Sequence, residues 1–238
     1  MPRMSSCSVA AGNAAFNFLI AISKRSGRGI RDVMESGEKL RQQFGNIDVY
    51  LFDQLLKGRF EPRMRILDAG CGAGRNLVYF LREGFDVCGV DHSPGAIARV
   101  SSLARSLAPH LPVENFRLEP VERMSFERES FDAVISSAVL HFARDEAHWH
   151  AMLGEMWRVL KPGGVFFARL ASSSGVERDL EHLGGRRYRL PGGGEWLLTD
   201  ERMLRETTDS MHGELMETLK TVVVYGARSM AVWCVRKL

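Results

Sequence analysis

The sequence predicts an α/β protein with a doubly wound, mostly parallel sheet. Apolar runs alternate with segments of helical spacing over residues 65–170, as expected for successive strand–helix–strand units. The first run ends in Asp68 and is followed by glycines at alternate positions, and the second run ends in Asp91. These acids are expected at a ligand site, because ligands of open α/β sheets bind outside the carboxyl ends of the strands.

The turn after Asp68 has the composition of a cofactor-binding turn. Gly70, Gly72 and Gly74 permit positive φ and let the backbone approach a ligand closely. A helix expected at residues 77–82 would direct its unpaired N–H groups at an anion. Asp68 is placed to take a cationic or N–H group. A ligand with both a carboxylate and an ammonium group, such as the methionine part of S-adenosylmethionine, fits this pairing.

The second acid completes the predicted site. Asp91 ends the apolar run at residues 86–91, and in dinucleotide folds an acid roughly 20 residues beyond the glycine turn holds ribose hydroxyls. The spacing of the turn argues against a nicotinamide or flavin cradle. That cradle needs a small third residue in G-x-G-x-x-G/A, at the place where this chain has Arg75.

The remaining elements follow in chain order. Ser93 and Pro94 provide a cap and a first-turn proline for a helix that reaches about Leu107. Strands are expected at residues 113–119, 131–139 and 165–170, helices at 145–160 and from 199 onward, and a terminal hairpin at 218–225 and 229–236.

Four ordered segments resemble the class I S-adenosylmethionine-dependent methyltransferases. They are ILDAGCGAGRN at 66–76, VCGVDHSP at 87–94, SFDAVISSAVLHF at 130–142 and EMWRVLKPGGVFFARL at 155–170. The resemblance implies a Rossmann-like sheet of seven strands with a terminal antiparallel hairpin, and S-adenosyl-L-methionine as cofactor. It implies methyl transfer to a small-molecule acceptor. The run GRNLVYFLREGFDVCGVD also resembles the tellurite-resistance branch, which extends the expected acceptors to metalloids.

The resemblance also implies which residues bind the cofactor. Those expected around the methionine end are Asp68, Ala69, Gly70, Cys71, Gly72, Gly74 and Asn76. Asp91 is expected at the ribose hydroxyls, with His92 and Ser93 beside the adenosine. Those expected at the ends of the third and fourth strands are Pro120, Val121 and Ser137. Proline stands where relatives have an acid for the adenine amine, which leaves Glu119 and Glu122 as alternatives for that contact.

His141 is the candidate catalytic residue. It follows the fourth strand, where the methyl group is expected, and its ordinary pKa near neutrality suits a general base. A base is needed only if the acceptor loses a proton on attack. The alternative is that His141 orders its loop or contacts the cofactor. Arg169, on the following strand, is a candidate anchor for the acceptor.

Composition is ordinary for a soluble globular protein, and a cytoplasmic location is expected. The net charge of +3 is spread along the chain, which gives no reason to expect nucleic acid as a partner, and no apolar stretch is long enough to span a membrane. The cysteines form no C-x-x-C motif and have no histidine at metal-ligand spacing, so neither a metal site nor a disulfide is expected. A monomer or homodimer is expected.

The predicted organisation has three parts. Residues 1–35 are expected to form a flexible arm, although an acid-free, Arg- and Ser-rich start is also typical of a transit peptide. Residues 36–62 are expected to form a lid or cap, with one helix over 38–60. Residues 63–238 are expected to form the methyltransferase domain that the resemblance implies. Within it, the glycine-rich insertion at 172–198 is either an acceptor lid or a solvated basic loop.

Two other functions remain open. A non-catalytic cofactor-binding partner subunit would keep the cradle and lose access for an acceptor. A nicotinamide-dependent oxidoreductase would share the fold, but Arg75 and the expected hairpin argue against it.

Overall fold

The computed structural model describes residues 30–176, 178, 180–224 and 228–238. The chain divides into two compact units, residues 1–45 and 46–238. In the first unit the described residues form helix α2 (Ile30–Phe44) and the glycine that ends it. The arm predicted for residues 1–35 lies mostly outside the described residues, and α2 runs across its predicted end.

The single helix predicted over residues 38–60 is wrong, because the structure has two helices there. Gly45 ends α2 with a φ of 64°, and its N–H donates to the carbonyl of Arg41. Helix α3 (Val49–Leu56) then begins in the second unit with Asp48 as its N-cap, whose side chain accepts from the N–H of Tyr50. Gly45 and Asp48 therefore separate α2 from α3, although the spacing of the apolar residues continues from one helix to the other.

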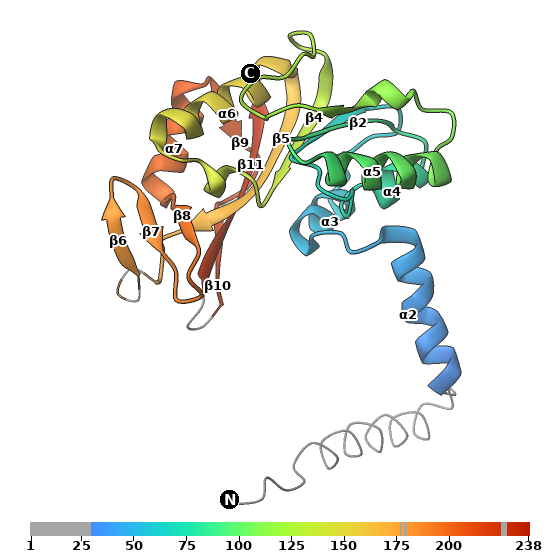
Figure 1. Cartoon of the computed structure of the whole chain (residues 1–238), viewed down its shortest axis with the longest axis horizontal. Coiled ribbons are helices and arrows are strands. Elements are labelled where there is room, and N and C mark those ends of the chain that lie inside the picture. The colour runs from blue at the N-terminus through green and yellow to red at the C-terminus, as the bar shows by residue number, and fades with distance from the viewer. Residues whose placement is uncertain (1–29, 177, 179, 225–227) are drawn as a thin grey trace, which may run out of the picture. The chain divides into compact units, whose positions relative to one another are not determined.

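A central sheet forms the core of the second unit (Figure 1). Among the described residues it has eight strands, seven of them in the order β10-β11-β5-β4-β1-β2-β3, with β9 paired to β11. The parallel strands are β1 (Arg65–Ala69), β2 (Asp86–Asp91), β3 (Phe116–Leu118), β4 (Phe131–Ser137) and β5 (Leu160–Ser172). The antiparallel strands are β9 (Gly213–Leu215), β10 (Lys220–Val224) and β11 (Arg228–Lys237). The doubly wound fold and its terminal hairpin are confirmed, and β9 is an addition to the expected seven strands.

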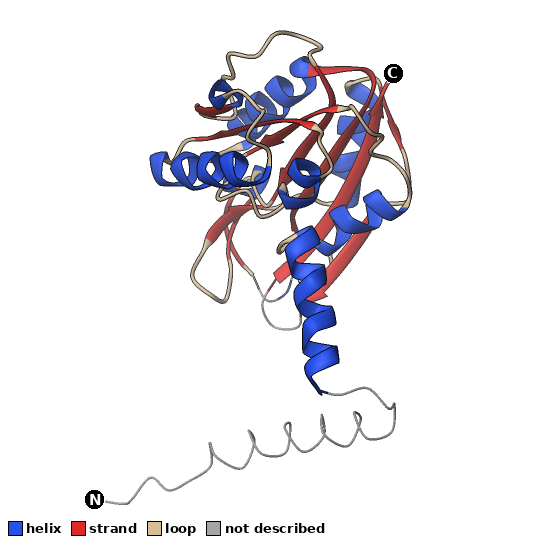
Figure 2. Ribbon diagram, turned by 90° about the vertical axis from the view of Figure 1, so that its right-hand side faces the viewer, coloured by secondary structure: helices blue, strands red, loops and turns tan. Residues whose placement is uncertain are grey.

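Helices cover both faces of this sheet (Figures 1 and 2). One face packs against α3, α4 (Val78–Arg82) and α5 (Pro94–Leu107), and the other packs against α6 (Glu146–Val159) and α7 (Glu201–Ser210). Successive strand residues serve opposite faces: Val134 belongs to the α6 side, and its neighbours Ala133 and Ile135 belong to the α5 side. Burial on both faces explains the near-continuous apolar run of β4.

The predicted cap Ser93 is confirmed, whereas some strand limits are not. Ser93 caps α5 with its side chain, and Asp145 and Asp200 do the same for α6 and α7. The third strand is shorter than expected, because a 3-10 turn, η1 (Val113–Asn115), precedes it. The fifth strand begins at Leu160, directly after α6, instead of at Val165. The Lys-Pro-Gly-Gly run at 161–164 is therefore part of the strand. The pairing of β5 with β4 is irregular there, with a register shift between Phe131 and Ala133.

The insertion at 172–198 forms a small antiparallel sheet in its described part. Its strands are β6 (Glu181–Gly184), β7 (Arg187–Arg189) and β8 (Glu195–Leu197). A further 3-10 turn, η2 (Leu140–Phe142), contacts β8. In the described part of the chain no helix is long and apolar enough to cross a bilayer.

Candidate functional site

The glycine turn lies at the carboxyl end of β1, next to the end of β2. The N–H groups of Gly70 and Cys71 donate to the carbonyl of Val90, at 2.8 and 2.9 Å, so the turn is fastened to the neighbouring strand. Gly70 has a φ of 82°, and a Cβ there would lie 2.5 Å from Cγ2 of Val139. Gly72 has a φ of 53° and nothing within 4 Å of a Cβ position, so it faces open space. The turn thus combines tight packing at its start with room for a ligand at its centre.

The helix expected after the turn is present, but it contributes less to anion binding than the sequence indicates. Helix α4 has five residues and begins at Val78, and its N-cap, Leu77, makes no side-chain capping bond. So short a helix adds little dipole at the turn. The cradle therefore consists of turn backbone and carboxylates.

Asp68 is a buried carboxylate with an unsatisfied oxygen. Its exposed fraction is 2%, and its Oδ2 has no hydrogen-bond partner. Burial raises its pKa to about 7, opposed by the charge of Arg75 and reinforced by that of Asp91. An orphaned buried acceptor is costly unless a donor arrives. A ligand ammonium would supply both the hydrogen and the countercharge, so Asp68 fits the methionine end of the proposed cofactor.

Asp91 joins the two halves of the cradle. Its Oδ2 accepts from the N–H of Gly72 and its Oδ1 from the N–H of Ser93, both at 2.9 Å. Each carboxylate oxygen has a further acceptor site after these bonds. Asp91 is therefore held in one orientation while it still can accept from a pair of vicinal hydroxyls.

A first pocket, of about 300 Å³, begins at His92, the residue that follows Asp91. It brings together three predicted residues, His92, Pro120 and Val121, with Glu122 beside them. Glu119, the other candidate for the adenine contact, instead accepts from the backbone and hydroxyl of Ser125. The structure thus places Glu122, and not Glu119, at the pocket.

Other predicted residues have structural roles. Ala69 is fully buried in the core, and burial raises the pKa of the Cys71 thiol, which packs against Gly89. Asn76 is buried, and its Oδ1 accepts from the backbone N–H of Asp48 at 3.0 Å, which fastens the end of the turn to the start of α3.

A second pocket, of about 400 Å³, carries a cluster of charges. Arg75, Arg169 and Arg228 line it with a single carboxylate, Asp48. Asp48 is buried and lies 3.3 Å from Arg169 and 3.6 Å from Arg75. Arg75 also donates to the hydroxyl of Ser137 at 3.1 Å. Ser137, one of the predicted cofactor-binding residues, therefore contacts an arginine that lines the second pocket.

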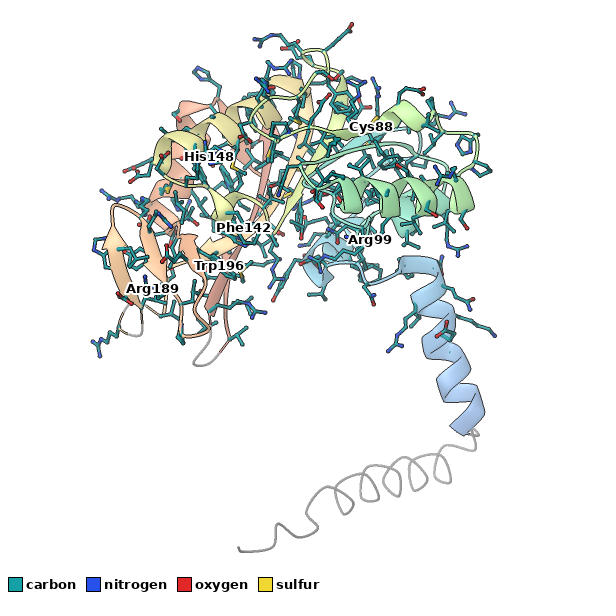
Figure 3. The ribbon with its side chains drawn as sticks, in the orientation of Figure 1. Cys88, Arg99, Phe142, His148, Arg189 and Trp196 are labelled. Atoms are coloured by element: carbon teal, nitrogen blue, oxygen red, sulfur yellow. The ribbon has the colours of Figure 1, made fainter. Side chains whose placement is uncertain are left out.

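His141 lines the second pocket with two aromatic residues. Its ring lies 4.4 Å from the rings of both Phe142 and Trp196, measured between centroids, and Phe142 and Trp196 lie side by side in Figure 3. His141 is buried, and its Nδ1 has no hydrogen-bond partner. Burial, together with the charge of Arg228, lowers its pKa to about 4. The imidazole is therefore neutral at physiological pH, and it can accept a hydrogen bond or a proton.

The arginines of the small sheet do not reach this pocket. Arg187 pairs with Glu195, Arg189 pairs with Glu181 and Glu195, and Figure 3 shows Arg189 on the outer part of the sheet. Of the described residues in the insertion at 172–198, only Trp196 lines either pocket described above. The described part of the insertion therefore contributes an aromatic wall and a charged outer face.

Sequence reasoning missed several lining residues. In the first pocket these are Phe142, Arg144, His148 and Met152, and in the second they are Asp48, Arg228 and Met230. His148 stands 3.2 Å from Glu122, across the first pocket. The spacing of His148 on α6 gives no hint of this role, because its neighbours in the pocket come from distant segments. In the described residues no group of three potential metal ligands is present.

Part of the chain is similar in sequence to known methyltransferases. Residues 67–168 match the family model described as "Methyltransferase domain". The chain is 32% identical over 105 residues to an uncharacterised methyltransferase of Synechocystis sp., covering 44% of this chain and 46% of that protein. It is 34% identical over 119 residues to a ubiquinone biosynthesis O-methyltransferase of Methylocella silvestris, covering 48% and 44%. The chain thus spans about half the length of these curated relatives.

The fold extends further than the sequence likeness. The 1,6-didemethyltoxoflavin-N1-methyltransferase of Burkholderia thailandensis, whose crystal structure contains 1,6-didemethyltoxoflavin and S-adenosylhomocysteine, superposes with a TM-score of 0.62 at 20% identity. The match covers 99% of this chain and 93% of that one. The sequence likeness to methyltransferases therefore covers residues 67–168, and beyond that segment the likeness to solved structures shows a shared fold.

Proposed function

We propose that the protein transfers a methyl group from S-adenosyl-L-methionine to a small-molecule acceptor. The observation that carries the proposal is the orphaned, buried Oδ2 of Asp68 beside a glycine turn that Asp91 holds open. The matched methyltransferase segment includes both acids. The metalloid acceptors expected from the sequence have no further support here.

In this proposal each part of the cofactor has a partner of matching chemistry. Asp68 takes the ammonium, and the backbone around Gly72 lies against the methionine part. Asp91 takes the ribose hydroxyls, and the pocket of Pro120 and Val121 takes the adenine, with the carboxylate of Glu122 in reach of its amine. Bound S-adenosylmethionine would supply an electrophilic methyl group on a sulfonium sulfur.

The protein's own part in the reaction is to position the acceptor and exclude water. The second pocket is the place for the acceptor, because Phe142 lines both pockets and the two therefore adjoin. His141 is the proposed proton acceptor, since its neutral ring faces this space. With so low a pKa it suits an acceptor that loses its proton readily, or one that needs only a hydrogen bond.

Isothermal titration calorimetry with S-adenosylmethionine tests the proposal. Wild-type protein is expected to bind with micromolar affinity, and Asp91→Asn to bind at least tenfold more weakly, because the amide no longer accepts from both the protein backbone and the ribose. Asp209→Asn, an exposed position on α7, is the matched control and should bind like wild type. Failure of wild-type protein to bind S-adenosylmethionine would refute the proposal.

A further inference from the structure

The second pocket has an excess of positive charge that the described protein does not neutralise. Three arginines line it against one carboxylate, and His141 is neutral. The oxygens of Asp48 are already used: Oδ1 accepts from the N–H of Tyr50, and both oxygens face Arg169 at 3.3 and 3.4 Å. Asp48 therefore has little capacity left to balance a second or third guanidinium.

The register of the sheet places two of these arginines at one edge and on one face. Arg169 lies opposite Val232 in the β5–β11 ladder, and Ser172, the last residue of β5, lies opposite Ser229. Opposite residues of an antiparallel pair share a face, and so do alternate residues along a strand. Arg228, four residues before Val232, is thus on the face of Arg169 and at the carboxyl end of β5.

Arg228 differs from Arg75 and Arg169, the other two arginines that line the second pocket. Among the described residues no carboxylate lies within ion-pair distance of it, whereas Arg169 and Arg75 both lie near Asp48. Arg169 is further held by stacking on the ring of Tyr50, 4.5 Å from its centroid. Arg169 is therefore fixed in place, and Arg228 presents its N–H donors to the pocket.

The rest of the wall is mainly aromatic. Trp196 and Phe142 stand 6.0 Å apart between centroids, and His141 lies against both. Aromatic walls favour a flat ligand body, and guanidinium groups favour a carboxylate, which they bind through paired N–H bonds. From these walls and charges, and resting on the methyl transfer proposed above, we propose that the acceptor is a flat, carboxylate-bearing small molecule whose anion is held by Arg228 and Arg169.

The proposal has a consequence for His141. The charge of Arg228 helps to lower the pKa of that imidazole. An anion bound to Arg228 would offset this charge and make His141 a stronger base when the acceptor is present. The other charged groups that line the pocket are Asp48, Arg75 and Arg169.

Calorimetry with matched pairs of probes tests the proposal. The probes are benzoate and benzamide, 4-hydroxybenzoate and its amide, and indole-3-acetate and its amide, each titrated into full-length protein saturated with S-adenosylhomocysteine. In at least one pair the carboxylate is expected to bind tenfold or more tightly than the amide. Arg228→Gln should remove this preference and Arg228→Lys should restore part of it, while Arg189→Gln, on the outer face of the small sheet, should retain it.

The outcomes separate this proposal from the methyltransferase proposal. If S-adenosylhomocysteine binds and no pair shows a preference for the carboxylate, the acceptor class is wrong and the cofactor proposal stands. The acceptor class is also wrong if Arg228→Gln keeps the preference. If S-adenosylhomocysteine itself does not bind, the methyltransferase proposal fails first. Arg228 is exposed at the start of β11, so its substitution is expected to leave the fold intact.

Discussion

Asp68 shows how a single residue can be costly for the fold and necessary for binding. Its buried oxygen has no partner, and its raised pKa means that the folded protein favours its protonated form. Relative to the unfolded chain, its contribution to the free energy of unfolding is favourable below pH 4 and is lost as the pH rises through 7.

Asp68→Asn is therefore expected to stabilise the protein and abolish cofactor binding. At pH 8 the amide avoids the buried charge, and the free energy of unfolding should rise by roughly 1–3 kcal/mol. Affinity for S-adenosylhomocysteine should fall at least a hundredfold, because the ammonium loses its countercharge. Urea denaturation and calorimetry measure the two effects, with Asp209→Asn as the control. A variant that is less stable than wild type at pH 8 would contradict this account of Asp68.

The affinity for S-adenosylhomocysteine should also depend on pH through the same residue. With a pKa of about 7, Asp68 is mostly protonated below neutrality in the free protein, and binding of the ammonium must then release its proton. Affinity should fall about tenfold for each pH unit below 7 and level off above about pH 8. Calorimetry from pH 5.5 to 8.5 checks this, with Asp209→Asn as the control that should keep the dependence. A flat profile in wild type would show that Asp68 is already ionised.

At the scale of elements, substitutions at two glycines with the same backbone conformation distinguish an effect on stability from an effect on cofactor binding. Gly72 and Gly84 both have positive φ, 53° and 75°, and neither has an atom within 4 Å of a Cβ position. Gly72 lies in the cradle, whereas Gly84 connects α4 to β2. Alanine at either position should cost about 1 kcal/mol of unfolding free energy, from the left-handed conformation alone.

Only Gly72→Ala is expected to weaken binding. Its new methyl group would occupy the space proposed for the methionine part, so affinity for S-adenosylhomocysteine should fall at least tenfold. Gly84→Ala should bind like wild type. Thermal denaturation and calorimetry on both variants measure the two effects. Equal binding by the two would mean that the open space at Gly72 is not part of the site.

Elements differ in how much of them the sequence predicts. The cap Ser93 could be predicted because its side chain satisfies an N–H group of its own helix, which is a local requirement. The break between α2 and α3 was missed because the apolar spacing continues across it. Helix α4 was predicted to within one residue, at 77–82, but the bonds that Arg75 and Asn76 make to residues far away in sequence could not be foreseen.

At the scale of the whole molecule, the cradle and the second pocket differ in how far the sequence predicts them. The cradle lies on one short segment and the end of the next strand, so the order of residues reveals it. The second pocket takes Asp48, Arg169, Trp196 and Arg228 from four distant segments. Their meeting depends on the ladder between β5 and β11 and on the contact of β8 with η2, which no local pattern contains.

The second unit is expected to fold without the first. The core clusters, as far as the structure describes them, use residues from Ile47 onward. A protein that begins at Asn46 should therefore keep its free energy of unfolding within about 1 kcal/mol of the full chain, because it retains every residue of the core clusters described above. Urea denaturation followed by circular dichroism measures this. A loss of the cooperative transition would show that residues 1–45 are part of the folding unit.

The central claim is that the cradle of Asp68, Gly72 and Asp91 binds S-adenosylmethionine and not a nicotinamide cofactor. Parallel calorimetric titrations of wild-type protein with S-adenosylhomocysteine and with NADH test it most directly. We expect micromolar binding of S-adenosylhomocysteine and no measurable binding of NADH. Tighter binding of NADH, or no binding of S-adenosylhomocysteine, would contradict the claim and point to redox chemistry or a structural role.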